Sequence, residues 1–324
     1  MSEVLSGRRP DRVPVSVWLH NFTREQTPAD LIAETLRLQE KFQFDFVKPQ
    51  SPWQSACVLW GTEVPQSASA DEFPIATRFA VRKDGDVEGI THKPVTGMLA
   101  DQVEVMRDVR AALGPDTPVV ATIFSPMMTL SFMHETGKAG VLSLMHSNPR
   151  ALAKALANIA KTLTDFAKQV MDIGIDGVFY ASTTCNSGEL NRTEHDDFHA
   201  PFDAQILDAC AGGWMNILHL CGTAVEAEFF AGYAPPIFSW DTSPENPTLS
   251  EMHELTDKVV LSGIPGKPAF GETSAEDLEA RVAASIAEMD GMHQIIGPGC
   301  SVNPGGDETL ISAVVNAARK PRPT

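Results

Sequence analysis

The feature that constrains the fold most is a regular alternation of short apolar runs with longer amphipathic segments. Eight runs rich in β-branched or aromatic residues have the length of buried strands, and helical patterns separate most of them. Parallel strands joined by helices form an open sheet or a closed barrel, and eight strands in one chain favour the barrel. The runs cover residues 13–20, 44–49, 118–124, 176–181, 215–221, 236–241, 258–263 and 293–299.

Start and stop signals define the helices between these runs. Thr27 followed by Pro28 predicts a helix that reaches residue 42, because threonine caps helix N-termini and proline is tolerated in the first turn. A 3.6-residue period predicts further helices over 98–113, 147–174 and 274–291, the last two ending at glycine. No glycine-rich phosphate loop follows the first strand, which argues against an open dinucleotide-binding sheet. We therefore predict an α/β fold, a (β/α)8 TIM barrel.

The stretch 50–117 between the second and third predicted strands is longer than a barrel connection needs. We predict a single domain over residues 1–324, in which 50–117 is an insertion that closes as a lid over the barrel mouth.

The charge of the chain excludes two classes of partner. Its formal net charge is −17 and it has no basic block, whereas nucleic acids and anionic membrane surfaces require clustered Lys and Arg. The N-terminal residues lack the apolar core of a signal peptide, and no stretch of about 18 apolar residues occurs. We expect a cytoplasmic enzyme that acts on a small molecule. The five cysteines of such a protein are more often buried, catalytic or metal-bound than disulfide-linked.

The candidate metal ligands stand where a TIM barrel keeps its reactive groups, at the carboxyl ends of the strands. His219 and Cys221 end the fifth run, and residues two apart on a strand face the same side, about 7 Å apart at their Cα atoms. Imidazole and thiolate suit Zn²⁺, and Cys300, which follows the eighth run, supplies a third ligand of the same kind. Taken alone, His-x-Cys is a weak signal that fits a buried strand end with an inert thiol better, and only the position of Cys300 makes metal binding an equal alternative.

The other polar residues at strand ends are further candidates for the site, and several of them have more than one interpretation. Asp241 either orients the histidine ligand, or acts as a further ligand, or caps the helix that follows. Tyr180 either donates a hydrogen bond to the substrate or belongs to the core. Cys185 is a ligand or substrate contact, or an ordinary loop thiol. His20 and Asn21 are predicted to line the substrate pocket.

The sequence resembles the uroporphyrinogen decarboxylase superfamily over nearly its whole length. The opening "GRRPDRVPVSVWLH", the segment "IFSPMMTLSFM" and the stretch "GIDGVFYASTTCNSG" are similar to the family's strands one, three and four. The most specific matches are "ILHLCGT" and "GPGCSVNPGGDETLISAVVNAAR", which are similar to the zinc-dependent, corrinoid-linked methyltransferases such as the methylcobamide:coenzyme M methyltransferases. That resemblance implies that His219, Cys221 and Cys300 bind zinc, which activates an acceptor thiol.

Two departures from the family narrow the expected activity. True uroporphyrinogen decarboxylases carry an arginine-rich motif after the first strand, but this chain reads "VWLHNFTREQ", with only Arg24 nearby. A substrate with many carboxylates requires several Arg donors, so porphyrin decarboxylation is disfavoured. The chain also lacks a D-x-H-x-x-G cobalamin-binding motif, so any corrinoid is expected to arrive on a partner protein.

We therefore predict a zinc-dependent methyltransferase that moves a methyl group between a corrinoid or small methyl donor and a thiol or similar acceptor. The alternative is a zinc-assisted decarboxylase or lyase of a small carboxylic acid, in which Tyr180 or Asp241 moves a proton. A binding module that keeps the fold without turnover is a third possibility.

Overall fold

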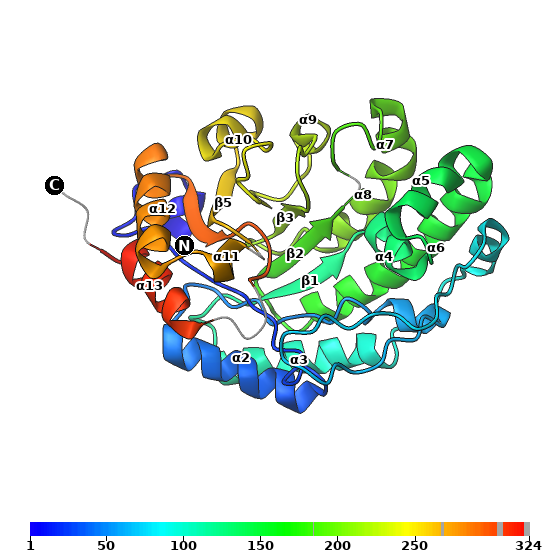
Figure 1. The fold of residues 1–324 in the computed structure, drawn as a ribbon, viewed down its shortest axis with the longest axis horizontal. Helices are drawn as coiled ribbons and strands as arrows, with labels where there is room; N and C mark the ends of the chain where they lie inside the picture. The colour runs from blue at the N-terminus through cyan, green and yellow to red at the C-terminus, as the bar shows by residue number, and fades with distance from the viewer. Residues whose placement is uncertain (184, 267–268, 303–306, 321–324) are drawn as a thin grey trace.

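Six parallel strands form the centre of the protein, and each pairs with the next along the chain (Figure 1). The computed structural model describes residues 1–183, 185–266, 269–302 and 307–320. The strands coincide with the last six apolar runs predicted from the sequence, and only β2 and β5 extend one residue beyond them. They are β1 (Val120–Phe124), β2 (Gly177–Ser182), β3 (Ile217–Leu220), β4 (Ile237–Trp240), β5 (Val259–Ile264) and β6 (Gln294–Pro298).

The first two predicted strands connect the two edges of this sheet, although they form isolated bridges rather than regular strands. Residues 13–20 bridge to β6 at Val15 and Ile296, and residues 44–49 bridge to the start of β1 at Val47 and Val119. The two segments also contact each other, because the Asp45 amide donates to the Val15 carbonyl at 2.9 Å. These contacts join β6 to β1 through the two N-terminal segments, which completes the TIM barrel.

Side-chain hydrogen bonds explain why these two segments are irregular. The carboxylate of Asp45 accepts the Val15 amide at 2.8 Å, and the Ser16 hydroxyl donates to the Phe46 carbonyl at 2.9 Å. Pro14 has no amide hydrogen to donate. Side chains therefore satisfy backbone groups that a strand pair would otherwise satisfy.

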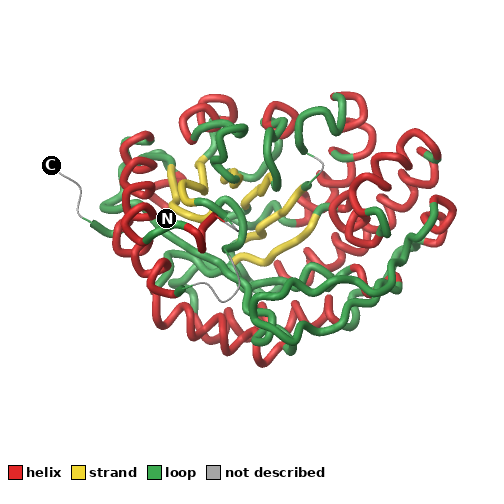
Figure 2. The backbone as a smooth tube through the Cα atoms, in the orientation of Figure 1, coloured by secondary structure: helices red, strands yellow, loops and turns green. Residues whose placement is uncertain are grey.

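The helices surround the strands, as Figure 2 shows. The predicted helices are confirmed: Thr27 accepts the Asp30 amide as N-cap of α2, Asn148 caps α6, and Ser274 caps α12. The helices are α1 (Ser2–Leu5), α2 (Pro28–Phe42), η1 (Cys57–Trp60), η2 (Asp84–Gly89), α3 (Met98–Leu113), α4 (Pro126–Met133), α5 (Gly137–Ser147), α6 (Pro149–Met171), α7 (Arg192–Phe198), α8 (Ala200–Ala209), α9 (Ala227–Phe230), α10 (Leu249–Thr256), α11 (Ala269–Glu272), α12 (Ala275–Glu288) and α13 (Glu308–Ala318). Within the described parts of the chain, none of them has the length and apolar character needed to cross a bilayer.

The predicted insertion 50–117 divides into two parts. Residues 98–113 form α3, which packs against α2 and α6 in the outer ring of helices. Residues 50–97 are mostly loop, interrupted by the short 3-10 helices η1 and η2. The extra length of the connection therefore lies in 50–97.

Alternation along the strands separates the barrel interior from the layer of helices. On β2, Phe179 belongs to an interior cluster with Trp18 and Phe46, whereas Tyr180 belongs to the core that the helices cover. Since residues two apart share a face, the same alternation on β3 directs His219 inward, where its ring stacks on Phe179.

Candidate metal centre

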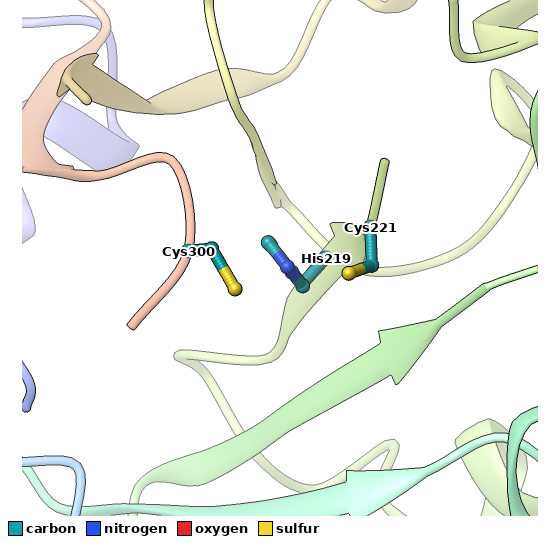
Figure 3. A group of neighbouring side chains, drawn as sticks. All are labelled: His219, Cys221 and Cys300. Carbon is teal, nitrogen blue, oxygen red and sulfur yellow. The ribbon is translucent and has the colours of Figure 1, made fainter. Parts of the chain in front are cut away.

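Three side chains of two different segments meet at one end of the barrel. His219 lies on β3, Cys221 follows that strand, and Cys300 follows β6. One potential ligand atom from each lies within 4.8 Å of the other two. In Figure 3 the His219 ring lies between the two cysteines. The structure thus brings together the three residues predicted as metal ligands.

The His219 ring is held on two sides. Its Nδ1 lies 3.2 Å from the Oγ of Ser239, which is its register partner on β4. The ring of Phe179 stacks on it with centroids 5.0 Å apart. His219 is only 3% exposed. A hydrogen bond to one ring nitrogen fixes the tautomer and leaves the other nitrogen for a metal, as in known metal sites.

The two cysteines form the second part of the site. The Cys221 amide donates to the Ser182 carbonyl at 2.8 Å, which fixes its position beside the end of β2. A hydrogen bond with Cys300 raises the pKa of Cys221 most, and burial raises it further. Two hydrogen-bonded thiols beside an imidazole are the donor set of a soft or borderline ion, so the residues fit Zn²⁺.

Close backbone packing fixes the loop that carries Cys300. A Cβ on Gly299 would lie 2.4 Å from the Cα of Asp241, and a Cβ on Gly266 would lie 2.8 Å from the Cys300 amide nitrogen. The Asp241 carboxylate accepts the Gly266 amide at 3.2 Å. Asp241 is therefore tied to the Cys300 loop. It does not cap the following helix, whose N-cap is Thr248.

His20 and Asn21 lie near one carboxylate. The Nδ1 of His20 is 2.8 Å from Glu25, and the Asn21 amide donates to the same carboxylate at 2.6 Å. His20 also stacks on Phe22, with centroids 5.0 Å apart, and lines a cavity that reaches Cys221. Asn21 contributes its backbone to this arrangement, and its side chain accepts from Thr23.

Cys185 and Tyr180 lie outside the cavity. The Cys185 thiol donates to the Cys221 carbonyl at 3.5 Å, and burial raises its pKa to about 12, so it supports a ligand's backbone as a neutral thiol. Tyr180 is fully buried on the outer face of β2, and its hydroxyl donates to Asp203. The structure therefore does not bring Tyr180 to the metal centre.

Lys48 approaches the site from the barrel interior. Its amine donates to Gln50 at 3.0 Å and lies over the faces of Trp18 and Phe179. Burial lowers the pKa of Lys48 to about 8, against the opposing effects of Cys300 and Glu25. The Lys48 ammonium therefore loses its proton more readily than an exposed lysine, and its charge acts on Cys300 of the candidate metal centre.

A cavity of about 770 Å³ opens from the metal centre toward the loop 50–97. Cys221 and Ser301, the neighbour of Cys300, lie in its wall, so a ligand in the cavity can reach the thiols. The other lining residues come from the first predicted strand end and the residues after it, the long loop, α3, the end of β1, and α4. They are His20, Phe22, Glu25, Gln26, Ser51, Pro52, Trp53, Gln54, Val64, Gln66, Ser67, Asp71, Phe73, Pro74, Met98, Asp101, Phe124, Met128 and Phe132.

Most of this wall was not identified from the sequence. The rings of Trp53, Phe22, Phe73 and Phe132 carry no sequence signal of their own, because nothing in a loop sequence tells which rings turn inward. Ser239 carried a usable signal, since it stands two residues before Asp241 and therefore on the same face of β4.

The sequence profile of the uroporphyrinogen decarboxylase family matches residues 1–321. The chain belongs to the uroporphyrinogen decarboxylase family. Its candidate metal ligands lie in the two segments whose motifs gave the most specific resemblance, although residues 303–306 of the second motif are outside the described residues. None of the curated protein sequences matches the chain significantly.

Solved structures share the architecture of this family member. A methyltransferase from Methanosarcina mazei superposes with a TM-score of 0.84 at 16% identity, covering 98% of this chain and 96% of its own. A B12-independent methionine synthase from Shewanella sp. W3-18-1, in complex with selenomethionine, gives a TM-score of 0.58 at 13% identity, covering 96% and 92%. At these identities the similarity establishes the common barrel fold.

Proposed function

We propose that this protein is a zinc-dependent methyltransferase that transfers a methyl group between a small or corrinoid-bound donor and a thiol acceptor. The observation that carries the proposal is the convergence of His219, Cys221 and Cys300 within 4.8 Å at the end of a cavity. Three protein ligands leave one position of a tetrahedral ion for a substrate atom.

Zinc held by these residues would lower the pKa of an acceptor thiol and present it as a thiolate at neutral pH. Two thiolates and a neutral imidazole would balance the charge of the ion, so a bound acceptor thiolate would bring the site to −1 and stay nucleophilic. The similarity in fold to proteins described as methyltransferases is consistent with this chemistry.

The protein's own groups orient the site and keep it dry. Ser239 fixes the His219 ring, and Asp241 positions the Cys300 loop through the Gly266 amide. We assign Asp241 this positioning role in preference to proton transfer. The long loop contributes residues 51–54 and 64–74 to the cavity wall, where it would act as a lid that excludes water during transfer.

The charge of the cavity favours methyl transfer over decarboxylation. Beyond the ion itself, a carboxylic acid substrate would find no cationic partner in the described wall, which includes Glu25, Asp71 and Asp101 and no Lys or Arg. A corrinoid donor would be delivered by a partner protein docked at the open end of the cavity.

The test is a metal and activity assay on matched cysteine variants. Purified wild type should contain about one zinc ion per chain. Cys221→Ala and Cys300→Ala should lose both the zinc and the demethylation of methylcobalamin in the presence of small thiols, followed by absorbance. Cys210→Ala is the control, since Cys210 is buried away from the site.

Two results would contradict the proposal. Wild-type protein refolded or loaded with zinc that retains less than about half an ion per chain would exclude the metal centre. Full zinc with carbon dioxide release from small acids, and no methyl transfer to any thiol, would favour the lyase alternative.

A further inference from the structure

The cavity wall contains a continuous series of aromatic rings. Trp53 lies at its middle: its ring stacks on Phe73 with centroids 6.0 Å apart and packs at 59° against Phe132 at 5.2 Å. Phe22 stands perpendicular to Phe73, and Phe124 stands nearly perpendicular to Phe132, both with centroids 5.6 Å apart. All five rings line the cavity, and two pairs of them stand nearly perpendicular, so ring faces of different orientation contribute to its wall.

The charges in the same wall are negative. Asp71 and Asp101 line the cavity, and within the described parts of the chain neither carboxylate forms an ion pair with a Lys or Arg. Asp101 stands in the first turn of α3, where the helix dipole stabilises an ionised carboxylate. Glu25 is a third carboxylate of the wall, and it is already hydrogen-bonded to the His20 ring and the Asn21 amide. Lys48 lines a separate small cavity on the other side of Glu25 and is not part of this wall.

Aromatic faces and carboxylates are complementary to one ligand class. The faces of Trp and Phe carry negative potential and attract a cation, most strongly when its charge is spread over methyl groups and easily desolvated. A neutral ligand would use the rings but not the carboxylates, and an anion would be repelled by Asp71 and Asp101.

We propose that the cavity binds a methylated onium cation, a quaternary ammonium or sulfonium compound, as the small methyl donor. This inference rests on the proposed function for the donor's role, but the binding itself does not require the metal. In the transfer, the carbon–nitrogen or carbon–sulfur bond of the donor breaks and its electron pair stays on the heteroatom. The acceptor thiolate forms the new sulfur–carbon bond, so a cation and an anion yield two neutral products without any redox change.

Calorimetric titration with choline and 3,3-dimethylbutan-1-ol separates charge from shape, because the two molecules have the same shape and differ in charge. Choline should bind at least about tenfold more tightly than the neutral alcohol. Tetramethylammonium and trimethylsulfonium, titrated alongside, show which heteroatom is preferred. The titrations are repeated on the Cys221→Ala protein, which removes a metal ligand and keeps the wall rings.

Asp101→Asn should weaken choline binding about three- to tenfold while binding of the alcohol stays the same. Asp108→Asn is the matched control, because Asp108 lies on the same helix, is exposed, and changes the net charge equally. Phe132→Leu should weaken binding of the cations through loss of a ring face, with circular dichroism confirming the fold.

Equal affinities for choline and the alcohol, no heat from any onium probe, or equal effects of Asp101→Asn and Asp108→Asn would overturn the inference. Onium binding that persists in Cys221→Ala, combined with a wild type that carries no zinc, would leave the inference standing and remove the proposed function. Zinc-dependent methyl transfer without binding of any onium probe would support the proposed function and overturn the inference.

Discussion

The imidazole of His219 and the hydroxyl of Ser239 meet across paired positions of β3 and β4, with Nδ1 and Oγ 3.2 Å apart. Both side chains are buried, so the hydroxyl is not exchanged for water. The contact selects which ring nitrogen faces the cysteines.

Ser239→Ala should therefore weaken zinc binding about 10- to 100-fold, the range found when an outer partner of a histidine ligand is removed. Competition with a chromophoric chelator measures the affinity. Ser262→Ala is the control, because Ser262 is an equally buried strand serine whose hydroxyl donates to the Trp240 carbonyl. Equal zinc affinities for the Ser239→Ala protein and the wild type would show that the hydroxyl does not orient the ligand.

Gly299→Ala should disrupt the site because the added methyl group crowds the neighbouring backbone, although all three candidate ligands are kept. Its Cβ would lie 2.4 Å from the Asp241 Cα, so the Cys300 loop must move. We expect a loss of about 1–3 kcal/mol in the free energy of unfolding and reduced zinc content. Gly232→Ala is the control, because an added Cβ there meets nothing within 4 Å. A Gly299→Ala protein with wild-type stability and full zinc would contradict this account.

Removal of the metal should destabilise the wild type, since an ion that binds only the folded state stabilises it by mass action. A strong chelator is expected to lower the melting temperature by about 5–10 °C. The Cys221→Ala/Cys300→Ala double variant should melt at the same temperature with and without chelator. Scanning calorimetry measures both; a chelator effect of equal size in the double variant would place the stabilising ion elsewhere.

The barrel and its three candidate ligands were predictable because each rests on local rules. Apolar runs give the strands, strand alternation puts His219 and Cys221 on one side, and barrel geometry puts Cys300 at the same end. The irregular N-terminal pair was less predictable, because the side chains of Asp45 and Ser16 replace backbone pairing there.

The contents of the cavity depend on contacts between residues far apart in sequence. The stacking of Trp53 on Phe73 depends on how the long loop folds back over the barrel. Tyr180 looked like a strand-end donor, but it stands on the outer face of β2 and bonds to Asp203 of α8. The sequence placed these residues near the strand ends without showing the direction of their side chains.

A buried polar network beside the metal centre gives the protein a testable pH dependence. His199 bonds to Asp203 through Nδ1 at 2.6 Å and lies 3.1 Å from the Ser182 hydroxyl through Nε2. His195 stacks on His199, and Tyr233 donates to Asp203 at 2.9 Å. Burial acts to lower the pKa of His199, but the charge of Asp203 and the hydrogen bonds outweigh it, so the pKa is raised.

A histidine whose pKa is raised by folding stabilises the protein below its unfolded pKa of about 6.5, and this stabilisation is lost as the pH rises through the folded value. The free energy of unfolding of the wild type should therefore fall with rising pH above about 6.5.

Asp203→Asn should lower the free energy of unfolding by about 3 kcal/mol at pH 6, because the buried His199 cation loses its partner, and should flatten the pH dependence. Urea denaturation at several pH values measures both effects. His146→Gln, an exposed histidine control with a side chain 74% accessible, should retain the wild-type profile. An Asp203→Asn profile parallel to that of the wild type would show that His199 is not charged in the folded protein.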